Sequence, residues 1–290
     1  MKKLVMSTAI VAAMLATTAQ AYQNEATGTI SYAHSKDKAW SDNNEAAAIG
    51  GSFTYFLNPV ENKRGPLAED AFTTQTSNIT VAYSYAQGAS DLDDVKAHVF
   101  GGGAEFYIPS SALGLGNTTL YAAAAIGRPK FEGDNSNVYG YGAEIGFFPM
   151  QDLLLTAGVV GNGNAGKDND PNATIRAKYL TQLDANFVNT EASIVFGDHH
   201  NTLYQASADY YLDNTFSVGA GFAYASLRGG KDPYAININA RKFVAENLSL
   251  QGGISYGKGM VDAQEGVFEG IVADVRDNAV GVNLGATLRF

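Results

Sequence analysis

The sequence contains no cysteine, little proline and, after its first residues, no long apolar run. Without cysteine the protein has no disulfide bonds, even if it passes through an oxidising compartment. Beyond residue 21 no stretch approaches the roughly 20 consecutive apolar residues that a transmembrane helix needs. Basic residues are also few, 19 against 29 acidic. The net charge of −10 argues against a nucleic-acid partner, because phosphate binding needs a basic surface.

Two residue types are plentiful. The chain has 32 glycines and 16 tyrosines. Glycine suits strongly coiled strands and close backbone approach, and tyrosine suits a membrane–water interface, where its ring is apolar and its hydroxyl is hydrated.

The amino-terminal segment has the features of a secretory signal. A basic start at Lys2 and Lys3 precedes an apolar run from Leu4 to Leu15, and Ala19-Gln20-Ala21 is a small-x-small cleavage site. We therefore expect residues 1–21 to be a signal peptide and residues 22–290 to form one domain. A chain that is exported and enters a membrane without an apolar helix must form a closed barrel.

The carboxy-terminal segment predicts such a barrel. From Val280 to Phe290 the even positions are apolar, and the odd positions are small or polar. This alternation is that of a strand with one apolar and one polar face, and a terminal Phe is typical of the last strand of an outer-membrane barrel. A soluble β-sandwich also alternates, but its strands seldom carry so many glycines on the polar face.

The same alternation recurs along the chain and predicts an all-β fold, a transmembrane antiparallel up-and-down β-barrel of about fourteen strands. An even number places both ends of the barrel domain on the same side of the membrane. The expected strands are 24–36, 45–57, 77–87, 95–107, 117–127, 138–148, 153–162, 173–183, 190–198, 202–212, 215–226, 234–244, 248–258 and 278–290.

The connections alternate between short and long, as in outer-membrane barrels with short periplasmic turns and longer external loops. Aromatic residues stand before most of the short turns, and we expect them to form one girdle at the periplasmic interface. They are Tyr55, Phe56, Phe106, Tyr107, Phe147, Phe148, Tyr210, Tyr211, Phe243 and Phe290.

One connection on the periplasmic side, residues 58–76, is long. Its Gly65-Pro66 pair is followed by a segment that predicts one or two helical turns. Loops of this length often have a function. This one either partly occludes the lumen or caps the barrel from the periplasm, and the sequence leaves both open. The residues expected to constrict the lumen are Pro66, Leu67, Glu69, Asp70 and Phe72.

Three segments resemble the general bacterial porin family: Tyr55-Phe-Leu-Asn-Pro-Val-Glu-Asn, Gly65-Pro-Leu-Ala-Glu-Asp-Ala-Phe72 and Ser77-Asn-Ile-Thr-Val-Ala-Tyr-Ser-Tyr85. Within that family the chain is most similar to the small fourteen-stranded outer-membrane channels of Gram-negative bacteria. The resemblance implies passive passage of water and small polar solutes, with inward-folded connections that narrow the pore.

Several charged residues fall on the polar face of the expected strands. Their position is physically reasonable, because Arg or Lys facing lipid at the bilayer centre costs roughly 2–4 kcal/mol. Four acids and four bases predict a lumen without strong ion selectivity; alternatively, the charges simply pair and fill the barrel. The pore-lining candidates are Glu105, Glu144, Arg176, Lys178, Glu191, Asp209, Arg241 and Arg289.

Other motifs are weak. Gly166-Lys167 lacks the Ser or Thr of a P-loop and no helix follows it, and Asp168 with Asp170 lacks the ligand series of a calcium loop. Asp198 beside His199 and His200 is a poor catalytic pair, because neighbouring strand residues point to opposite faces. We expect no catalytic residues, no metal and no cofactor.

The sequence thus favours a porin-like diffusion channel in the cell outer membrane, in contact with outer-membrane lipid, lipopolysaccharide and small polar solutes. A surface interaction or adhesion protein mounted on a closed barrel is the alternative, and an enzyme at the outer rim ranks third. A monomer fits the size, and a trimer stays open.

Overall fold

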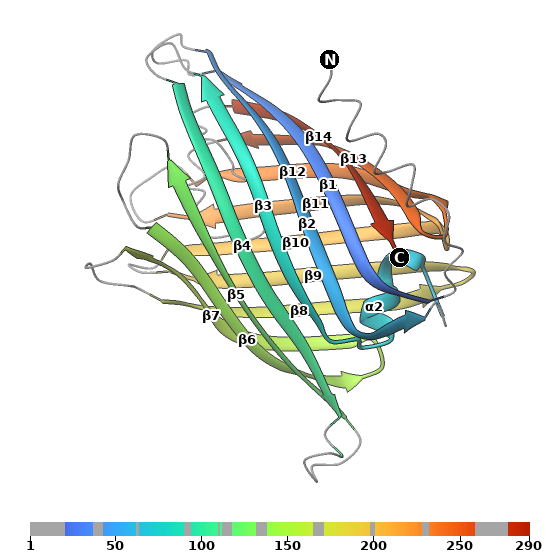
Figure 1. The fold of residues 1–290 in the computed structure, drawn as a ribbon. Helices are drawn as coiled ribbons and strands as arrows, with labels where there is room; N and C mark the ends of the chain where they lie inside the picture. Colours follow the sequence, from blue (N-terminus) through green and yellow to red (C-terminus); the bar gives the residue numbers. More distant parts are fainter. Residues whose placement is uncertain are drawn as a thin grey trace.

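A computed structural model shows fourteen antiparallel strands closed into a barrel (Figure 1). It describes residues 21–36, 43–61, 64–89, 94–109, 111, 118–131, 138–164, 171–197, 201–227, 232–258 and 278–290. The strands are β1 (Ala21–Lys36), β2 (Asn43–Glu61), β3 (Asn78–Ala89), β4 (Asp94–Pro109), β5 (Thr119–Phe131), β6 (Val138–Met150), β7 (Leu153–Asn164), β8 (Asn172–Leu183), β9 (Asn186–Phe196), β10 (Thr202–Asp213), β11 (Phe216–Ser226), β12 (Tyr234–Ala245), β13 (Leu248–Lys258) and β14 (Asn278–Arg289).

The predicted fold class and strand number are confirmed. Each strand pairs with its neighbours in sequence, and β1 pairs with β14 to close the sheet, with Glu25 opposite Arg289. The carbonyl oxygen of Phe290 accepts hydrogen bonds from the backbone of Gln23 and Asn24, at 3.2 and 2.9 Å. The predicted signal peptide lies outside the described residues except for Ala21, which begins β1.

The alternation places apolar side chains outside and small or polar ones inside. Ile145, Ile238 and Ile254 are 72%, 66% and 63% exposed, because in a membrane barrel this surface faces lipid. Some inward positions require glycine. A Cβ on Gly219 would lie 2.0 Å from Oδ1 of Asp209, so this glycine leaves room for a charged side chain in the lumen.

The start of β1, the end of β14 and the two-residue turns lie at the same end of the barrel. In outer-membrane barrels this is the periplasmic end. The β6–β7 and β8–β9 turns have a residue with positive φ, Asp152 at 59° and Asp184 at 55°. The β2–β3 connection at this end contains a 3-10 turn, η1 (Leu67–Glu69), and a short helix, α2 (Asp70–Thr73). Gly65, with φ of 89°, redirects the chain just before them. Among the described residues, no helix is long and apolar enough to cross a membrane.

The aromatic residues before the short turns do not form one girdle as expected, because only some of them face the lipid. Adjacent residues on a strand point to opposite faces, so each aromatic pair divides. Phe147 is 45% exposed on the lipid side, whereas Phe148 is 6% exposed on the inner side. Tyr210 and Tyr211 divide in the same way, at 38% and 4%. The inward member of each pair is available to pack against whatever enters the barrel.

Candidate functional site

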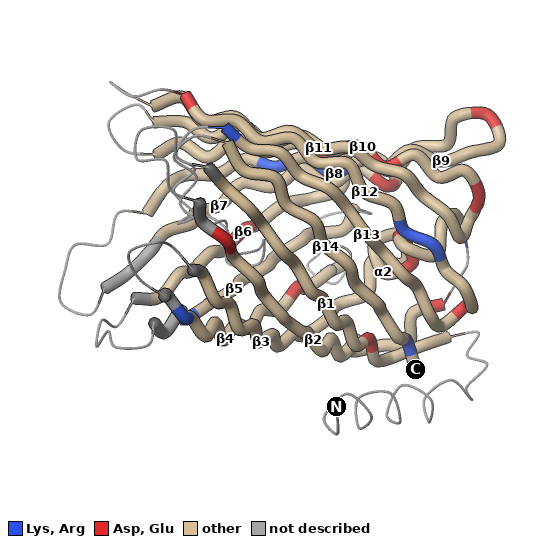
Figure 2. The backbone as a smooth tube through the Cα atoms, turned by 90° about the horizontal axis from the view of Figure 1, so that it is seen from above, with Lys and Arg blue, Asp and Glu red and all other residues tan. Residues whose placement is uncertain are grey.

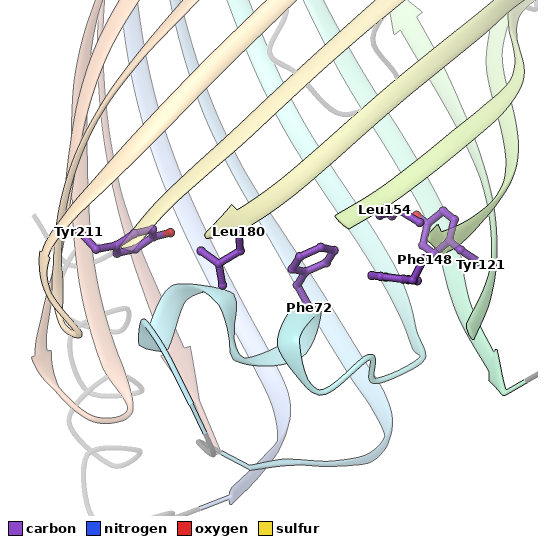
Figure 3. Packing of buried hydrophobic residues seen from close by; sticks show 6 residues of the cluster. All are labelled: Phe72, Tyr121, Phe148, Leu154, Leu180 and Tyr211. Carbon is purple, nitrogen blue, oxygen red and sulfur yellow. The ribbon is translucent and has the colours of Figure 1, made fainter. Parts of the chain in front are cut away.

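The β2–β3 connection folds into the periplasmic mouth of the barrel. We call residues 64–77 the inner turn. Phe72 on α2 is 7% exposed and packs in an apolar cluster with side chains from five strands (Figure 3). Burial of a Phe side chain stabilises by roughly 1.5–3 kcal/mol, so this cluster favours the inward position of the turn. Its other buried members are Tyr121, Phe148, Leu154, Leu180 and Tyr211.

Glu69 holds one side of the inner turn. Lys178 Nζ lies 2.8 Å from its Oε2. Asn189 Nδ2 and Tyr211 Oη donate to its Oε1 at 3.1 and 2.8 Å. These donors come from β8, β9 and β10, and Lys178 Nζ also lies 4.5 Å from the centroid of the Phe72 ring. A buried carboxylate is tolerated because it has an opposite charge and two further donors.

Arg289 on β14 holds the other side. Its Nη1 donates to the carbonyl oxygen of Leu67 at 2.8 Å and lies 3.6 Å from Oδ2 of Asp70. Its Nε donates to Glu25 at 2.9 Å. The C-terminus therefore lies beside α2, as Figure 1 shows. The last strand thus closes the barrel and also binds the inner turn.

Asp70 is less well satisfied than Glu69. Asp70 is 1% exposed, and among the described residues its Oδ1 has no hydrogen-bond partner. Burial raises the pKa of Asp70 to about 7, against the lowering effect of Arg289 and with a further rise from Glu69. The charge on this carboxyl group therefore depends on pH near neutrality.

Further contacts extend around the mouth. Leu67 N donates to the carbonyl of Asn214 in the β10–β11 turn at 2.9 Å. Arg64 pairs with Asp152 in the β6–β7 turn at 2.7 Å. With those of Glu69 and Arg289, these contacts join the inner turn to opposite parts of the wall. The inner turn therefore lies inside the periplasmic mouth. That it occludes the lumen stays a prediction.

A polar cluster lies next to the inner turn. Arg176 lies 2.7 Å from Glu144 and 3.3 Å from Glu191, and it donates to Tyr121 Oη at 3.3 Å. Tyr121 in turn donates to Glu105 at 2.9 Å. A cavity of about 320 Å³ lies between this cluster and the inner turn, lined on the turn side by Ala68, Glu69, Ala71, Phe72 and Thr76.

Comparison with known proteins agrees with this architecture. Residues 1–269 match the family model described as "Putative general bacterial porin". The chain belongs to this family. It is a bacterial outer-membrane β-barrel porin. The search of the curated proteins finds no relative.

Among solved structures, the outer membrane protein Omp33 of Acinetobacter baumannii is similar to this porin with a TM-score of 0.64. The two sequences are 22% identical, and the match covers 93% of this chain and 99% of that one. An outer membrane channel from Pseudomonas putida F1 matches with a TM-score of 0.49 and 11% identity, over 93% of this chain and 98% of that one. The Omp33 match supports the fold.

All eight predicted pore-lining residues of the porin lie on the inner face. Five of them, Glu105, Glu144, Arg176, Lys178 and Glu191, surround the cavity or contact its lining. Arg241 donates to Gln251 at 2.9 Å farther along the wall, and Asp209 lies beside Gly219. That they line a conducting path stays a prediction.

Sequence reasoning missed several residues that hold the site together. Tyr121, Asn189 and Tyr211 supply neutral donors, and Glu25 pairs with Arg289. All four stand at polar-face positions, so strand alternation was the signal that could have found them. Their partners depend on contacts between distant strands, which alternation does not give.

Among the described residues, the inward charges are not limited to the four predicted acids and four predicted bases. Glu25, Glu69 and Asp70 add to the acids, so seven inward carboxylates face four inward bases among the described residues. Figure 2 shows that most of each strand carries neither sign, so these few charges dominate the local field. The carboxylates are Glu25, Glu69, Asp70, Glu105, Glu144, Glu191 and Asp209, and the bases are Arg176, Lys178, Arg241 and Arg289.

The described part of the chain brings together no group of three potential metal ligands. The weak motifs of the sequence, Gly166-Lys167, Asp168 with Asp170, and Asp198 with His199 and His200, lie outside the described residues.

Proposed function

We propose that this porin is a passive diffusion channel for water, ions and small polar solutes, and that the inner turn narrows its periplasmic mouth. The observation that carries the proposal is the set of contacts that ties the inner turn to opposite parts of the wall. Glu69 contacts β8, β9 and β10, whereas Leu67 and Asp70 contact Arg289 on β14. A solute that crosses the barrel has to pass this segment.

The inward charges support conduction of ions and small polar molecules. Charged side chains that face a polar lumen keep water there and orient dipoles that enter it. Seven carboxylates against four bases favour cations, because a channel with walls of low dielectric constant concentrates the counter-ion. Glu105 contributes most plainly to this preference, since Asn78 and Tyr121, which donate hydrogen bonds to it, are neutral.

Recording in planar bilayers tests the proposal. We expect the full-length protein to give small conductance steps and a reversal potential that favours cations in a salt gradient. Arg176→Gln removes an inward base and should move the reversal potential further towards cations. Lys242→Gln is the matched control, because Lys242 is exposed at the β12 end near Asp213. No conductance steps would refute a channel, and equal reversal potentials in both variants would refute the placement of Arg176 in the path.

Swelling of liposomes in sugars of graded size measures what the constriction passes. We expect uptake of small sugars and exclusion of larger ones, with the cut-off set by the inner turn. A protein that excludes all of the solutes, including the smallest, would contradict passive diffusion.

A further inference from the structure

Two neighbouring side chains of β4 face the cavity beside the inner turn. Glu105 and Tyr107 are inward residues of this strand, and both line the cavity of about 320 Å³. They stand two residues apart, so their side chains lie next to each other on one face of the sheet. The volume is at the small end of the range for ligand pockets, about 300–1,000 Å³, and a small solute fits it.

Glu105 keeps its negative charge without a basic partner. Asn78 Nδ2 donates to its Oε2 and Tyr121 Oη donates to its Oε1, each at 2.9 Å. Both donors are neutral, and among the described residues no ion pair joins Glu105 to a base. Each carboxylate oxygen has two acceptor positions, so the group can still receive a cation from the cavity.

The two bases that line the same cavity already have opposite charges of their own. Lys178 Nζ lies 2.8 Å from Glu69. Arg176 lies 2.7 Å from Glu144 and 3.3 Å from Glu191. The charged residues around the cavity therefore carry an excess of negative charge, and Glu105 is its source.

The aromatic rings of the cavity show the same division. Lys178 Nζ lies 4.5 Å from the centroid of the Phe72 ring, and Arg176 Cζ lies 5.8 Å from that of Tyr121. No cation of the described part of the chain lies over Tyr107, whose ring meets that of Tyr121 at 5.3 Å and an interplanar angle of 66°. A carboxylate and an aromatic ring, neither of them used by a base of the protein, thus stand side by side.

The rest of the lining is partly apolar. Ala68 and Ala71 of the inner turn and Leu154 of β7 contribute methyl groups to the cavity. Such walls cannot replace the hydrogen bonds of a strongly hydrated ion. An alkylated ammonium ion has its charge inside an apolar shell, loses few hydrogen bonds here, and is attracted by both a carboxylate and an aromatic ring.

We propose that the cavity between β4 and the inner turn is a binding site for small alkylated ammonium ions, with Glu105 as the counter-charge and Tyr107 as the ring that contacts the cation. The proposal rests on the proposed function, because the cavity lies in the path that a solute takes past the inner turn. It adds a substrate class to that function, since a general diffusion path needs no such site.

Saturation-transfer NMR on the methyl protons of tetramethylammonium, with the full-length protein in maltoside micelles, tests the proposal. We expect binding that saturates in the millimolar range. Glu105→Gln should weaken it at least about tenfold, because the attraction between two unit charges in a partly buried site is lost. Tyr107→Leu keeps an apolar side chain but removes the ring, and it should weaken binding roughly 3- to 10-fold.

Each substitution has a matched control. Asp209→Asn removes an inward carboxylate that does not line this cavity, and Tyr107→Phe keeps the ring, so both should bind tetramethylammonium as the unchanged protein does. Heat-modifiable migration in gels shows that a variant is folded, and the two Tyr107 variants carry the test if Glu105→Gln does not fold. Equal losses in Glu105→Gln and Asp209→Asn would overturn the proposal, as would equal binding in the two Tyr107 variants.

The alkyl groups are tested by competition. Unsubstituted ammonium should displace tetramethylammonium only at concentrations about tenfold higher or more, because it is the more strongly hydrated ion. Displacement at equal concentrations would overturn the assignment to alkylated ions.

Recording in planar bilayers separates this proposal from the proposed function. Tetramethylammonium should reduce the potassium current of the unchanged protein, and should reduce that of Glu105→Gln less. Binding that depends on Glu105 in a protein without conductance steps would refute the channel and support the site. Conductance without saturation transfer to the methyl protons would support the channel and overturn the site.

Discussion

Glu69 and Asp70 are consecutive buried carboxylates on the inner turn, but they differ in the number of partners that the barrel wall supplies. Glu69 receives Lys178 and two neutral donors from three strands. Asp70 shares Arg289 with Glu25 and Leu67, and no described residue bonds to its Oδ1. Glu69 therefore fixes its side of the turn through one opposite charge and two hydrogen-bond donors. On the other side, the negative charge of Asp70 is poorly compensated.

Removal of the well-satisfied carboxylate should have the largest effect. Glu69→Ala leaves the ammonium group of Lys178 buried without its partner, which typically costs roughly 3–5 kcal/mol. The docked position of the inner turn should become much less populated, and the conductance in planar bilayers should rise. Glu45→Ala is the control, because Glu45 lies on the outer surface and its side chain is 57% exposed. Equal conductance of Glu69→Ala and the unchanged protein would show that Glu69 does not hold the turn.

The other carboxylate should make docking depend on pH. Docking raises the pKa of Asp70 to about 7 from an ordinary value near 3.8, so the docked turn binds the proton more tightly than a hydrated turn. This contribution to docking is fully present below the ordinary pKa and is lost as the pH rises through about 7. Conductance should therefore increase between pH 5 and pH 8.

Asp70→Asn tests whether Asp70 causes the pH dependence of the conductance, because the amide of the variant does not titrate between pH 5 and pH 8. Its conductance should stay nearly constant between pH 5 and pH 8, at the level that the unchanged protein shows at acidic pH. Arg289 and Glu69 face Asp70 directly and stay in place in this variant. The same pH dependence in Asp70→Asn as in the unchanged protein would assign the effect to another group.

Loss of the exposed ion pair between Arg64 and Asp152 should have the smallest effect on the conductance. Arg64 is 45% exposed where it pairs with Asp152, and such surface pairs contribute about 0–1 kcal/mol. Arg64→Gln should leave the conductance within the variation between single channels. A rise as large as that of Glu69→Ala would show that the turn is held from its periplasmic side rather than from within the lumen.

The sequence predicted the barrel well because its evidence is local. Alternation along Val280–Phe290 identifies the last strand, and the structure has β14 over Asn278–Arg289. The strand expected at 190–198 begins earlier, at Asn186, because only a two-residue turn separates β9 from β8. The alternation of apolar and polar residues continues into such a short turn. The composition therefore does not show where one strand ends and the next begins.

The site was predicted only in part because its contacts join distant residues. The sequence identified the turn from Gly65-Pro66 and placed Lys178 on a polar face. The ion pair between Lys178 and Glu69, however, requires that the barrel close and that the turn fold inward. The division of Phe147 and Phe148 between two faces follows from strand geometry and was available from the sequence.

The central claim is that the inner turn, when docked, restricts the channel, and a reversible tether tests it most directly. The protein has no cysteine, so Leu67→Cys/Asn214→Cys introduces one possible disulfide, where the backbones are joined by a hydrogen bond of 2.9 Å. In a Glu69→Ala background, we predict low conductance after oxidation and high conductance after reduction, with no redox effect in the single-cysteine variants. Equal conductance in the tethered and reduced states would contradict the claim.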